Sequence, residues 1–203
     1  MCGIIGYVGA DEVVPVILDG LRRLEYRGYD SAGMAVLAPD TIQILRAEGK
    51  LRNLEQLAYH HPLHGTTGVG HTRWATHGAP TEANAHPQID TNGEIAVVHN
   101  GILENYASLR RELLDDGVEL SSDTDTELIA QLLGREDGPL GDRVIKILPR
   151  LVGQYAVVAV SRSEPDTVVA FRQGPPLVVG LGKAQAVAEE QPLVGHRGHL
   201  GDE

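Results

Sequence analysis

The side chain with the clearest potential for chemistry is Cys2, the only cysteine in the chain. If Met1 is removed, Cys2 carries a thiol and a free α-amino group on the same carbon atom. The thiolate is the nucleophilic form of cysteine and needs a nearby base. Because an α-amino group titrates near pH ~7.7–8.0, it can accept that proton through one water molecule and return it later. A lone cysteine is more often a small buried hydrophobe, so other residues must decide between these interpretations.

The stretch from residue 71 to residue 78 gathers further polar and charged side chains. The planar guanidinium of Arg73 matches a carboxylate, with which it can form two parallel hydrogen bonds. A surface arginine beside a tryptophan that fills the core is the alternative, and the stretch taken alone favours it. A metal site at His71 and His77 is not expected, because their spacing fits no common zinc pattern.

Two later positions could stabilise charge. Asn100 and Gly101 lie between a predicted strand and a predicted helix. The backbone N–H groups of such a turn, with the Asn100 side-chain amide, could hold an oxyanion, although an ordinary Asn-Gly turn is the simpler interpretation. Asp125 lies at the start of another predicted helix. Its carboxylate could cap that helix or bind an ammonium group, and the sequence leaves both roles open.

The composition limits the class of protein. The 203 residues suffice for one domain, whose core must be aliphatic because 42% of the residues are apolar and only 4% are aromatic. No apolar run approaches the ~18 residues of a membrane-spanning helix. The formal net charge of −11, without a basic block, argues against nucleic acid or a membrane as partner. A single cysteine forms no internal disulfide, which fits a reducing cytoplasm.

Hydrophobic periodicity predicts the elements that must position these side chains. Residues 3–8 are typical of a short buried strand with Cys2 at its tip. Residues 25–33 are too polar and glycine-rich for a regular element. Helices are predicted at 11–24 with Asp11 as N-cap, 51–61, 103–114, 124–133 and 142–151. Strands are predicted at 34–37, 42–46, 67–74, 95–99, 155–160, 167–171 and 177–181. This order favours an α+β layered sandwich over a doubly wound parallel sheet.

Six motifs occur in one order along the chain, at residues 2–4, 27–33, 71–78, 84–87, 99–101 and 124–127. Together they resemble the glutaminase domains of class II glutamine amidotransferases, which belong to the N-terminal-nucleophile hydrolase superfamily. Residues 24–27 and 74–77 resemble the branch of the isomerizing glutamine–fructose-6-phosphate aminotransferases, or glucosamine-6-phosphate synthases. The resemblance covers residues 2 to about 182.

The resemblance implies roles for residues that bind and attack glutamine. Cys2 matches the nucleophile, and the Asn100 side-chain amide and Gly101 backbone N–H match the oxyanion hole. Arg73 matches the group that binds the α-carboxylate of glutamine. Asp125 matches the group that binds its α-ammonium.

The resemblance also implies supporting residues. Trp74, Thr76 and His77 match a loop that closes over glutamine, and Arg27 matches an arginine that organises the nucleophile. The histidines that match residues packed around the site are His86 and His99.

The fold implied by the resemblance is a four-layer αββα sandwich, in agreement with the predicted order of elements. We expect a glutaminase domain at residues 2–182 and a divergent tail at 183–203 without a strand pattern, so that the sandwich is incomplete at its C-terminal end. The family's isomerase domain, which accepts the ammonia, is not expected here. No cofactor and no metal are implied. The implied partners are L-glutamine and either a separate isomerase chain or a second copy of this chain.

Two functions are compatible with these expectations. The first is hydrolysis of L-glutamine to glutamate and ammonia through a thioester on Cys2, with the ammonia destined for fructose 6-phosphate in the complete relatives. The second is a truncated, catalytically silent remnant or binding module that keeps the glutaminase fold.

Overall fold

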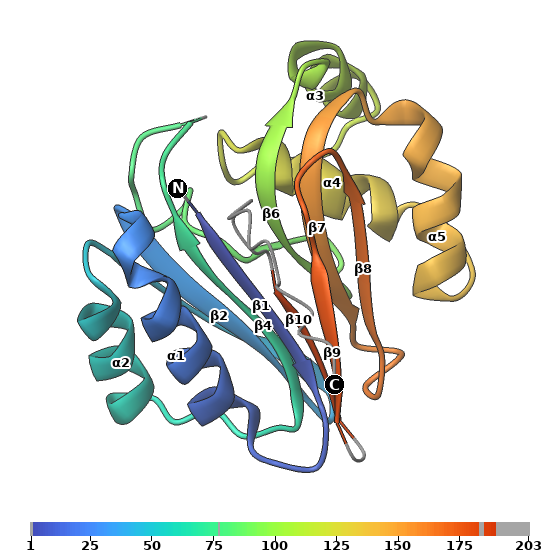
Figure 1. Cartoon of the computed structure of the whole chain (residues 1–203). Coiled ribbons are helices and arrows are strands. Elements are labelled where there is room, and N and C mark those ends of the chain that lie inside the picture. Colours follow the sequence, from blue (N-terminus) through green and yellow to red (C-terminus); the bar gives the residue numbers. More distant parts are fainter. Residues whose placement is uncertain (1, 77, 183–184, 190–203) are drawn as a thin grey trace, which may run out of the picture.

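Two antiparallel β-sheets face each other at the centre of the protein, and helices cover the outer face of each sheet (Figure 1). The computed structural model describes residues 2–76, 78–182 and 185–189. One sheet is covered by α1 (Val13–Leu24) and α2 (Leu51–His60). The other is covered by α3 (Tyr106–Asp115), α4 (Asp125–Gly134) and α5 (Leu140–Ile147). The predicted four-layer αββα sandwich is therefore confirmed.

Within the described residues, the first sheet has six strands in the order β3-β2-β4-β1-β10-β9. Their bounds are β1 Gly3–Val8, β2 Ser31–Ala38, β3 Thr41–Glu48, β4 Thr67–Arg73, β9 Val178–Gly182 and β10 Gln185–Glu189. The second sheet has the order β5-β6-β7-β8. Its strands are β5 Gln88–Ile89, β6 Ile95–Leu103, β7 Gly153–Ser161 and β8 Val168–Gln173. Long-range antiparallel pairing thus brings the N-terminal strand into the middle of the first sheet.

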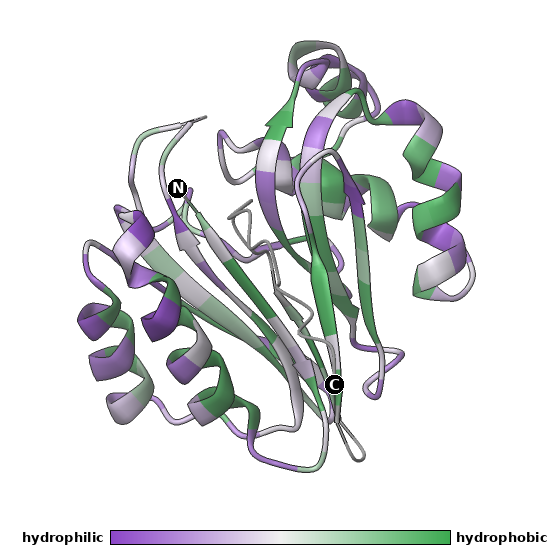
Figure 2. Cartoon of the chain, viewed as in Figure 1, coloured by the Kyte–Doolittle hydropathy of each residue, from purple (hydrophilic) through white to green (hydrophobic). Residues whose placement is uncertain are grey.

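The core is aliphatic, as the composition requires, and fills the space between the layers. Ile4, Val69, Val98 and Val158 are fully buried between the two sheets. Figure 2 shows hydrophobic residues along the central strands and hydrophilic residues on the outer sides of α1 and α2. In the described part of the chain, no helix is both long and apolar enough to cross a bilayer.

Most predicted elements are confirmed, but some boundaries were wrong. α1 begins at Val13 after Glu12, and the Asp11 backbone N–H instead donates to the hydroxyl of Tyr7. Residues 25–33 are not wholly irregular, because a 3₁₀ turn spans Glu25–Arg27 and β2 begins at Ser31. α5 ends at Ile147, since proline cannot donate a helical hydrogen bond, and Pro149 instead lies in a 3₁₀ turn.

The expectation that no strand follows residue 182 is wrong for residues 185–189. These residues form β10, which pairs with β1 on one side and with β9 on the other. Val187 packs toward the helices and Ala188 toward the second sheet. A five-residue strand with alanines at alternate positions has too weak an apolar pattern to be predicted from the sequence.

The close approach of α1 to the first sheet depends on glycine in β4. Gly70 faces Ile17 and Leu21 of α1, and a Cβ atom at this position would overlap with Cγ2 of Ile17. Both Ile17 and Leu21 are fully buried, so neither can move without disturbing the core.

We expect Gly70→Ala to lower the free energy of unfolding by about 1–3 kcal/mol, the usual cost of overpacking a core. The matched control is Gly141→Ala, since Gly141 is helical and no atom lies within 4 Å of the position that an alanine Cβ would take. Alanine there should be neutral or stabilising by up to about 1 kcal/mol. Urea unfolding of both variants tests the packing, and equal stability would contradict it.

Candidate functional site

The pairing of β1 with β4 decides what surrounds Cys2, which directly precedes β1. Gly3 lies opposite Thr72 in this antiparallel pair, so Cys2 lies beside the end of β4. The Trp74 backbone N–H donates a hydrogen bond to Cys2 Sγ at 3.2 Å. Arg27 Nη1 donates to the Cys2 carbonyl at 2.8 Å. Cys2 is therefore held both at its thiol and at its main-chain carbonyl, while the residue remains only half buried.

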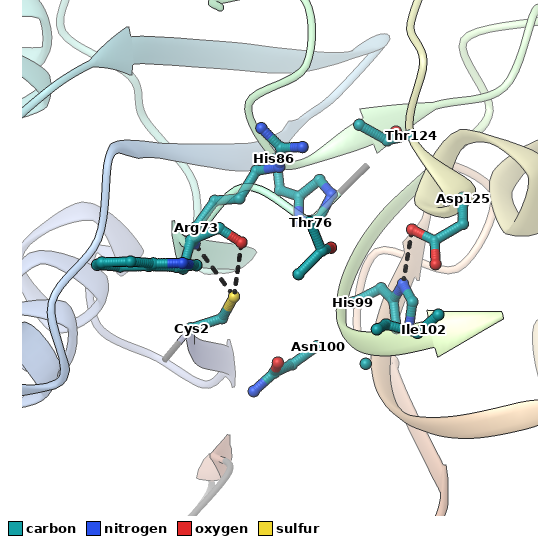
Figure 3. Close-up of a pocket in the computed structure, with 11 residues that line it drawn as sticks. Cys2, Arg73, Thr76, His86, His99, Asn100, Ile102, Thr124 and Asp125 are labelled. Atoms are coloured by element: carbon teal, nitrogen blue, oxygen red, sulfur yellow. Dashed lines mark hydrogen bonds and ion pairs between the residues drawn. The ribbon is translucent and has the colours of Figure 1, made fainter. Parts of the chain in front are cut away.

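The thiol faces a cavity of about 460 Å³ (Figure 3). The size suits a small polar molecule. The cavity is lined by Cys2, Arg73, Trp74, Thr76, His86, His99, Asn100, Gly101, Ile102, Thr124 and Asp125. These residues come from both sheets and from the start of α4, so the cavity lies between the two halves of the sandwich.

Arg73 places a cation in the cavity wall. Its side chain is buried, and its Nη1 and Nη2 atoms lie 3.4 Å and 3.3 Å from the carbonyls of Ala79 and Gly78. Burial lowers the pKa of Arg73, and the nearby Asp30 opposes this effect most strongly. Because arginine stays charged far above neutral pH, the wall can bind an anion.

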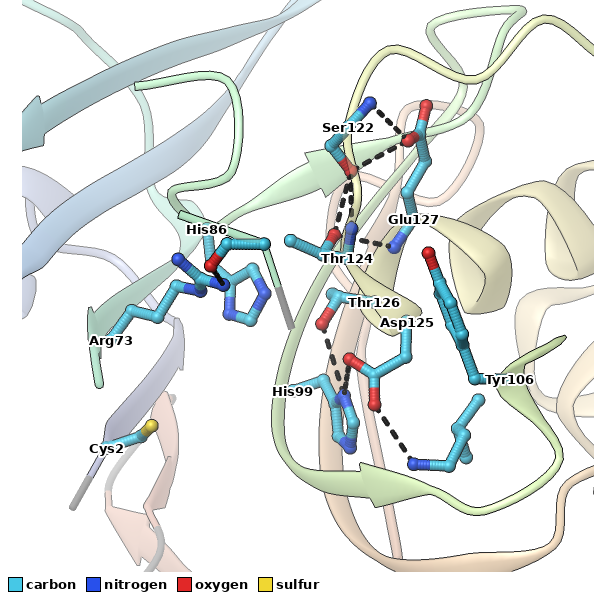
Figure 4. A network of polar contacts seen from close by, with 12 residues as sticks. Cys2, Arg73, His86, His99, Tyr106, Ser122, Thr124, Asp125, Thr126 and Glu127 are labelled. Carbon is cyan, nitrogen blue, oxygen red and sulfur yellow. Dashed lines mark hydrogen bonds and ion pairs between the residues drawn. The ribbon is translucent and has the colours of Figure 1, made fainter. Parts of the chain in front are cut away.

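A network at the start of α4 places Asp125 (Figure 4). Thr124 is the N-cap, with Oγ1 accepting from the Glu127 backbone N–H at 3.3 Å. The Glu127 carboxylate in turn accepts from the Ser122 backbone N–H at 2.7 Å. The Thr124 backbone N–H donates to Ser122 Oγ at 3.2 Å and not to Glu127, so Glu127 fixes the chain just before the N-cap, and Asp125 is left at the first helical position. Capping is thus performed by Thr124 and not by Asp125.

The Asp125 carboxylate is buried and directed toward β6. Its Oδ2 accepts from the Leu103 backbone N–H at 3.0 Å, and its Oδ1 lies 3.5 Å from His99 Nδ1. The side chain is only 5% exposed. A buried carboxylate favours a cationic partner because an unpaired buried charge is costly.

Asn100 and Gly101 line the cavity, but the turn predicted there is wrong. Both lie within β6 and pair with Ala156 and Tyr155 of β7, and α3 begins only at Tyr106. Gly101 has φ of 142°, and a Cβ atom would overlap with the Gln154 carbonyl. Glycine is therefore required where β6 and β7 approach closely. The long pairing with β7, invisible in the local sequence, keeps the segment extended.

Three histidines pack together at the cavity wall, where His86 and His99 line the cavity and His71 does not. His71 Nδ1 lies 3.2 Å from His86 Nδ1, and His99 Nδ1 lies 3.1 Å from Thr126 Oγ1. Burial lowers the pKa of His71 to about 3, with smaller contributions from its electrostatic interactions with neighbouring His99 and Arg73. Burial likewise holds the pKa of His86 well below its usual value. His71 and His86 are therefore neutral at physiological pH and add no charge near Arg73.

The structure brings together most of the residues singled out in the sequence. Arg27 does not line the cavity, but its side chain donates to the main-chain carbonyl of Cys2. His77 lies outside the described residues. The sequence analysis missed Asp30, Ile102 and Thr124. Thr124 could have been found from its spacing of three residues to Glu127, which is a sequence signature of a helix N-terminus. Nothing local distinguishes Ile102.

Comparisons with known proteins agree on one family. The family described as "Glutamine amidotransferase domain" matches residues 71–195. The chain is 52% identical over 189 residues to the isomerizing glutamine–fructose-6-phosphate aminotransferase of Streptomyces coelicolor, covering 91% of this chain and 31% of the relative. It is 47% identical over 186 residues to the enzyme of the same name from Aquifex aeolicus, again covering 91% and 31%. The chain thus spans about a third of these relatives.

A solved structure supports the fold. The glutamine phosphoribosylpyrophosphate amidotransferase of B. subtilis superposes with a TM-score of 0.80 and 26% identity, covering 93% of this chain and 41% of that one. The match extends over both sheets, because it includes nearly all of the chain.

The neutral histidines predict how stability depends on pH. Because the pKa of His71 falls from 6.5 to about 3 on folding, the unfolded chain binds more protons between these values. The free energy of unfolding should therefore decrease as pH falls below about 6.5, by up to about 1.4 kcal/mol per pH unit for each such histidine.

His71→Gln should flatten this pH dependence between pH 6 and 4.5, even if it lowers stability throughout. The control is His64→Gln, because the His64 side chain is 78% exposed. Urea unfolding at several pH values measures both slopes. An unchanged slope in His71→Gln would show that His71 is not held neutral.

Proposed function

Because the chain belongs to the glutamine amidotransferase domain family, we propose that it hydrolyses L-glutamine to glutamate and ammonia at Cys2. The observation that carries the proposal is the position of a thiol in a cavity that also holds a buried cation, Arg73, and a buried carboxylate, Asp125. Glutamine has an ammonium and a carboxylate on its α-carbon and an amide at the end of its side chain. The cavity offers a complementary group for each of them.

Catalysis requires the removal of Met1, which frees the α-amino group of Cys2. That amine takes the thiol proton through a water molecule, and the thiolate attacks the carboxamide carbon of glutamine. The Trp74 N–H at 3.2 Å favours the thiolate by donating to Sγ. The Asn100 side-chain amide and Gly101 N–H stabilise the oxyanion. The protonated α-amino group of Cys2 then gives the proton to the leaving nitrogen, which departs as ammonia, and water hydrolyses the thioester.

Substrate recognition uses opposite charges on opposite sides of the cavity. Arg73, at the end of β4, binds the α-carboxylate with its planar fork. Asp125, at the start of α4, binds the α-ammonium while its Oδ2 keeps the Leu103 N–H. Thr76 and Trp74 lie in the loop after β4, and together with His77 they close over the bound amino acid.

The fate of the ammonia follows from the relatives, which are named for fructose 6-phosphate as acceptor. We propose that the ammonia serves the synthesis of an amino sugar phosphate by an isomerase unit, in a longer protein, a separate chain or a homo-oligomer. Glutamine hydrolysis is the activity expected of these residues alone. A reducing compartment such as the cytoplasm suits the reaction, since the nucleophile must stay a free thiol.

The first test is Cys2→Ala, which should abolish glutamate formation while leaving the far-UV circular dichroism unchanged. The reason is that the chain has no second cysteine to replace the nucleophile. Mass analysis of the N-terminus must first establish that Met1 is absent from the wild-type protein. Substantial hydrolysis by the alanine variant, or by protein that retains Met1, would contradict the mechanism.

The second test separates recognition of the amino-acid group from general amidase chemistry. Removing one partner of a desolvated charge pair costs ~2–5 kcal/mol, so Arg73→Ala should raise the KM for glutamine by one or more orders of magnitude. Arg73→Lys should recover only part of this, because lysine keeps the charge without the fork. Asp125→Asn retains an oxygen for the Leu103 N–H but loses the charge, and it should also raise KM.

Steady-state kinetics with glutamine and with a simple primary amide that lacks both α-groups measures this selectivity. Arg23→Ala is the control, because the Arg23 side chain lies on the outer surface of α1 and is 77% exposed. If the Arg73 and Asp125 variants discriminate between the two amides as well as wild type does, the proposed binding mode is wrong.

A further inference from the structure

The segment from Arg27 to Asp30 contacts both Cys2 and the loop that follows β4. Arg27 Nη1 donates to the Cys2 carbonyl at 2.8 Å. Gly28, with φ of 73°, lies against the Trp74 indole, so that a Cβ atom would come within 3.3 Å of Cζ3. The Asp30 carboxylate accepts from the Ala75 backbone N–H at 2.7 Å. One short segment therefore links the nucleophile to the loop that carries Trp74.

Asp30 holds the backbone on both sides of Trp74. Its own backbone N–H donates to the Arg73 carbonyl at 2.8 Å, and its Oδ2 accepts from Ala75. Asp30 is itself fixed, because its carbonyl accepts from the Gly49 backbone N–H at 2.7 Å. The Arg73–Trp74 peptide, whose carbonyl accepts from Asp30, is the one whose N–H donates to Cys2 Sγ at 3.2 Å, and the Asp30 carboxylate holds the N–H of the next peptide. The direction of that N–H therefore depends on Asp30.

We propose that Asp30 is a positioning residue for the nucleophile, which holds the Trp74 N–H on Cys2 Sγ and so stabilises the thiolate. The expected effect of Asp30 on glutamine turnover rests on the proposed function. The effect on the thiol itself does not require glutamine. Asp30 is not among the residues that line the cavity, so it acts through the loop.

A purely electrostatic role for Asp30 predicts the opposite result. Asp30 also lies near Arg73 and counteracts the effect of burial on it. If only its charge mattered, its removal would leave a more positive site and favour the thiolate. If its hydrogen bond matters, its removal releases the loop and disfavours the thiolate. The sign of the change in thiol reactivity therefore distinguishes the two roles.

The chain carries two probes for this test, because it has one cysteine and one tryptophan. The rate of alkylation of Cys2 by iodoacetamide, measured against pH, reports the thiolate population. Acrylamide quenching of Trp74 fluorescence reports the position of the loop. The variants are Asp30→Ala, which removes the acceptor, and Asp30→Asn, which removes the charge but keeps an acceptor. Asp40→Ala, in the exposed turn between β2 and β3, is the control.

We expect Asp30→Ala to slow alkylation at pH 7 about tenfold, since the lost hydrogen bond to a charged group corresponds to about one pH unit in thiol titration. Quenching of Trp74 should increase. Asp30→Asn should remain within about threefold of wild type in both measurements, because a neutral acceptor retains part of the hydrogen bond. Asp40→Ala should match wild type. Glutamine hydrolysis by Asp30→Ala should show a kcat/KM profile whose acidic limb moves to higher pH.

Alkylation by Asp30→Ala at the wild-type rate or faster, with unchanged quenching, would overturn the inference. So would Asp30→Asn that is as slow as Asp30→Ala, since a side-chain acceptor for the Ala75 N–H would then be present without effect. If Asp30→Ala does not fold, Gly28→Ala tests the same segment, because the added Cβ atom would press on the Trp74 indole. Unchanged alkylation and quenching in Gly28→Ala would also overturn the inference. If wild type alkylates as expected but does not hydrolyse glutamine, the proposed function fails while the inference stands.

Discussion

β1 runs beside β4 with Gly3 opposite Thr72, and this register determines what surrounds the nucleophile. A shift by one residue would exchange the two faces of the strand. Such a shift is costly because both faces are buried, with Ile4 between the sheets and Ile5 beneath the helices. Packing of the whole sandwich therefore holds Cys2 beside the Trp74 N–H. The position of the reactive atom is a consequence of the core rather than of local structure.

The second sheet completes the site from the opposite side. Arg73 ends a strand of the first sheet, whereas Asn100 and Gly101 belong to β6 and Asp125 to the helix that covers it. The cavity between the sheets thus has a cation on one side and a carboxylate on the other. The buried histidines His71 and His86 stay neutral and place no further positive charge beside Arg73. A molecule with both charges on one carbon matches this arrangement.

The sequence predicted the layers and the members of the site better than it predicted their backbone geometry. The strand at residues 3–8 and the helix after Thr124 follow from local patterns and are present as expected. The extension of β6 through Gly101 and the strand at residues 185–189 depend on long-range pairing, which local periodicity does not contain. The contact of Asp30 with Ala75 joins positions 45 apart, and only the fold brings them together.

The central claim is that Cys2 forms a covalent bond with glutamine, and detection of that intermediate tests it most directly. Protein with an N-terminal Cys2 would be mixed with glutamine, quenched in acid within the first turnovers, and digested for mass spectrometry. The mechanism predicts that the peptide beginning at Cys2 gains the mass of one glutamyl group, and that prolonged incubation with water removes it. Release of ammonia at the full rate, with no glutamyl group ever detected on Cys2 under conditions that preserve thioesters, would contradict the account.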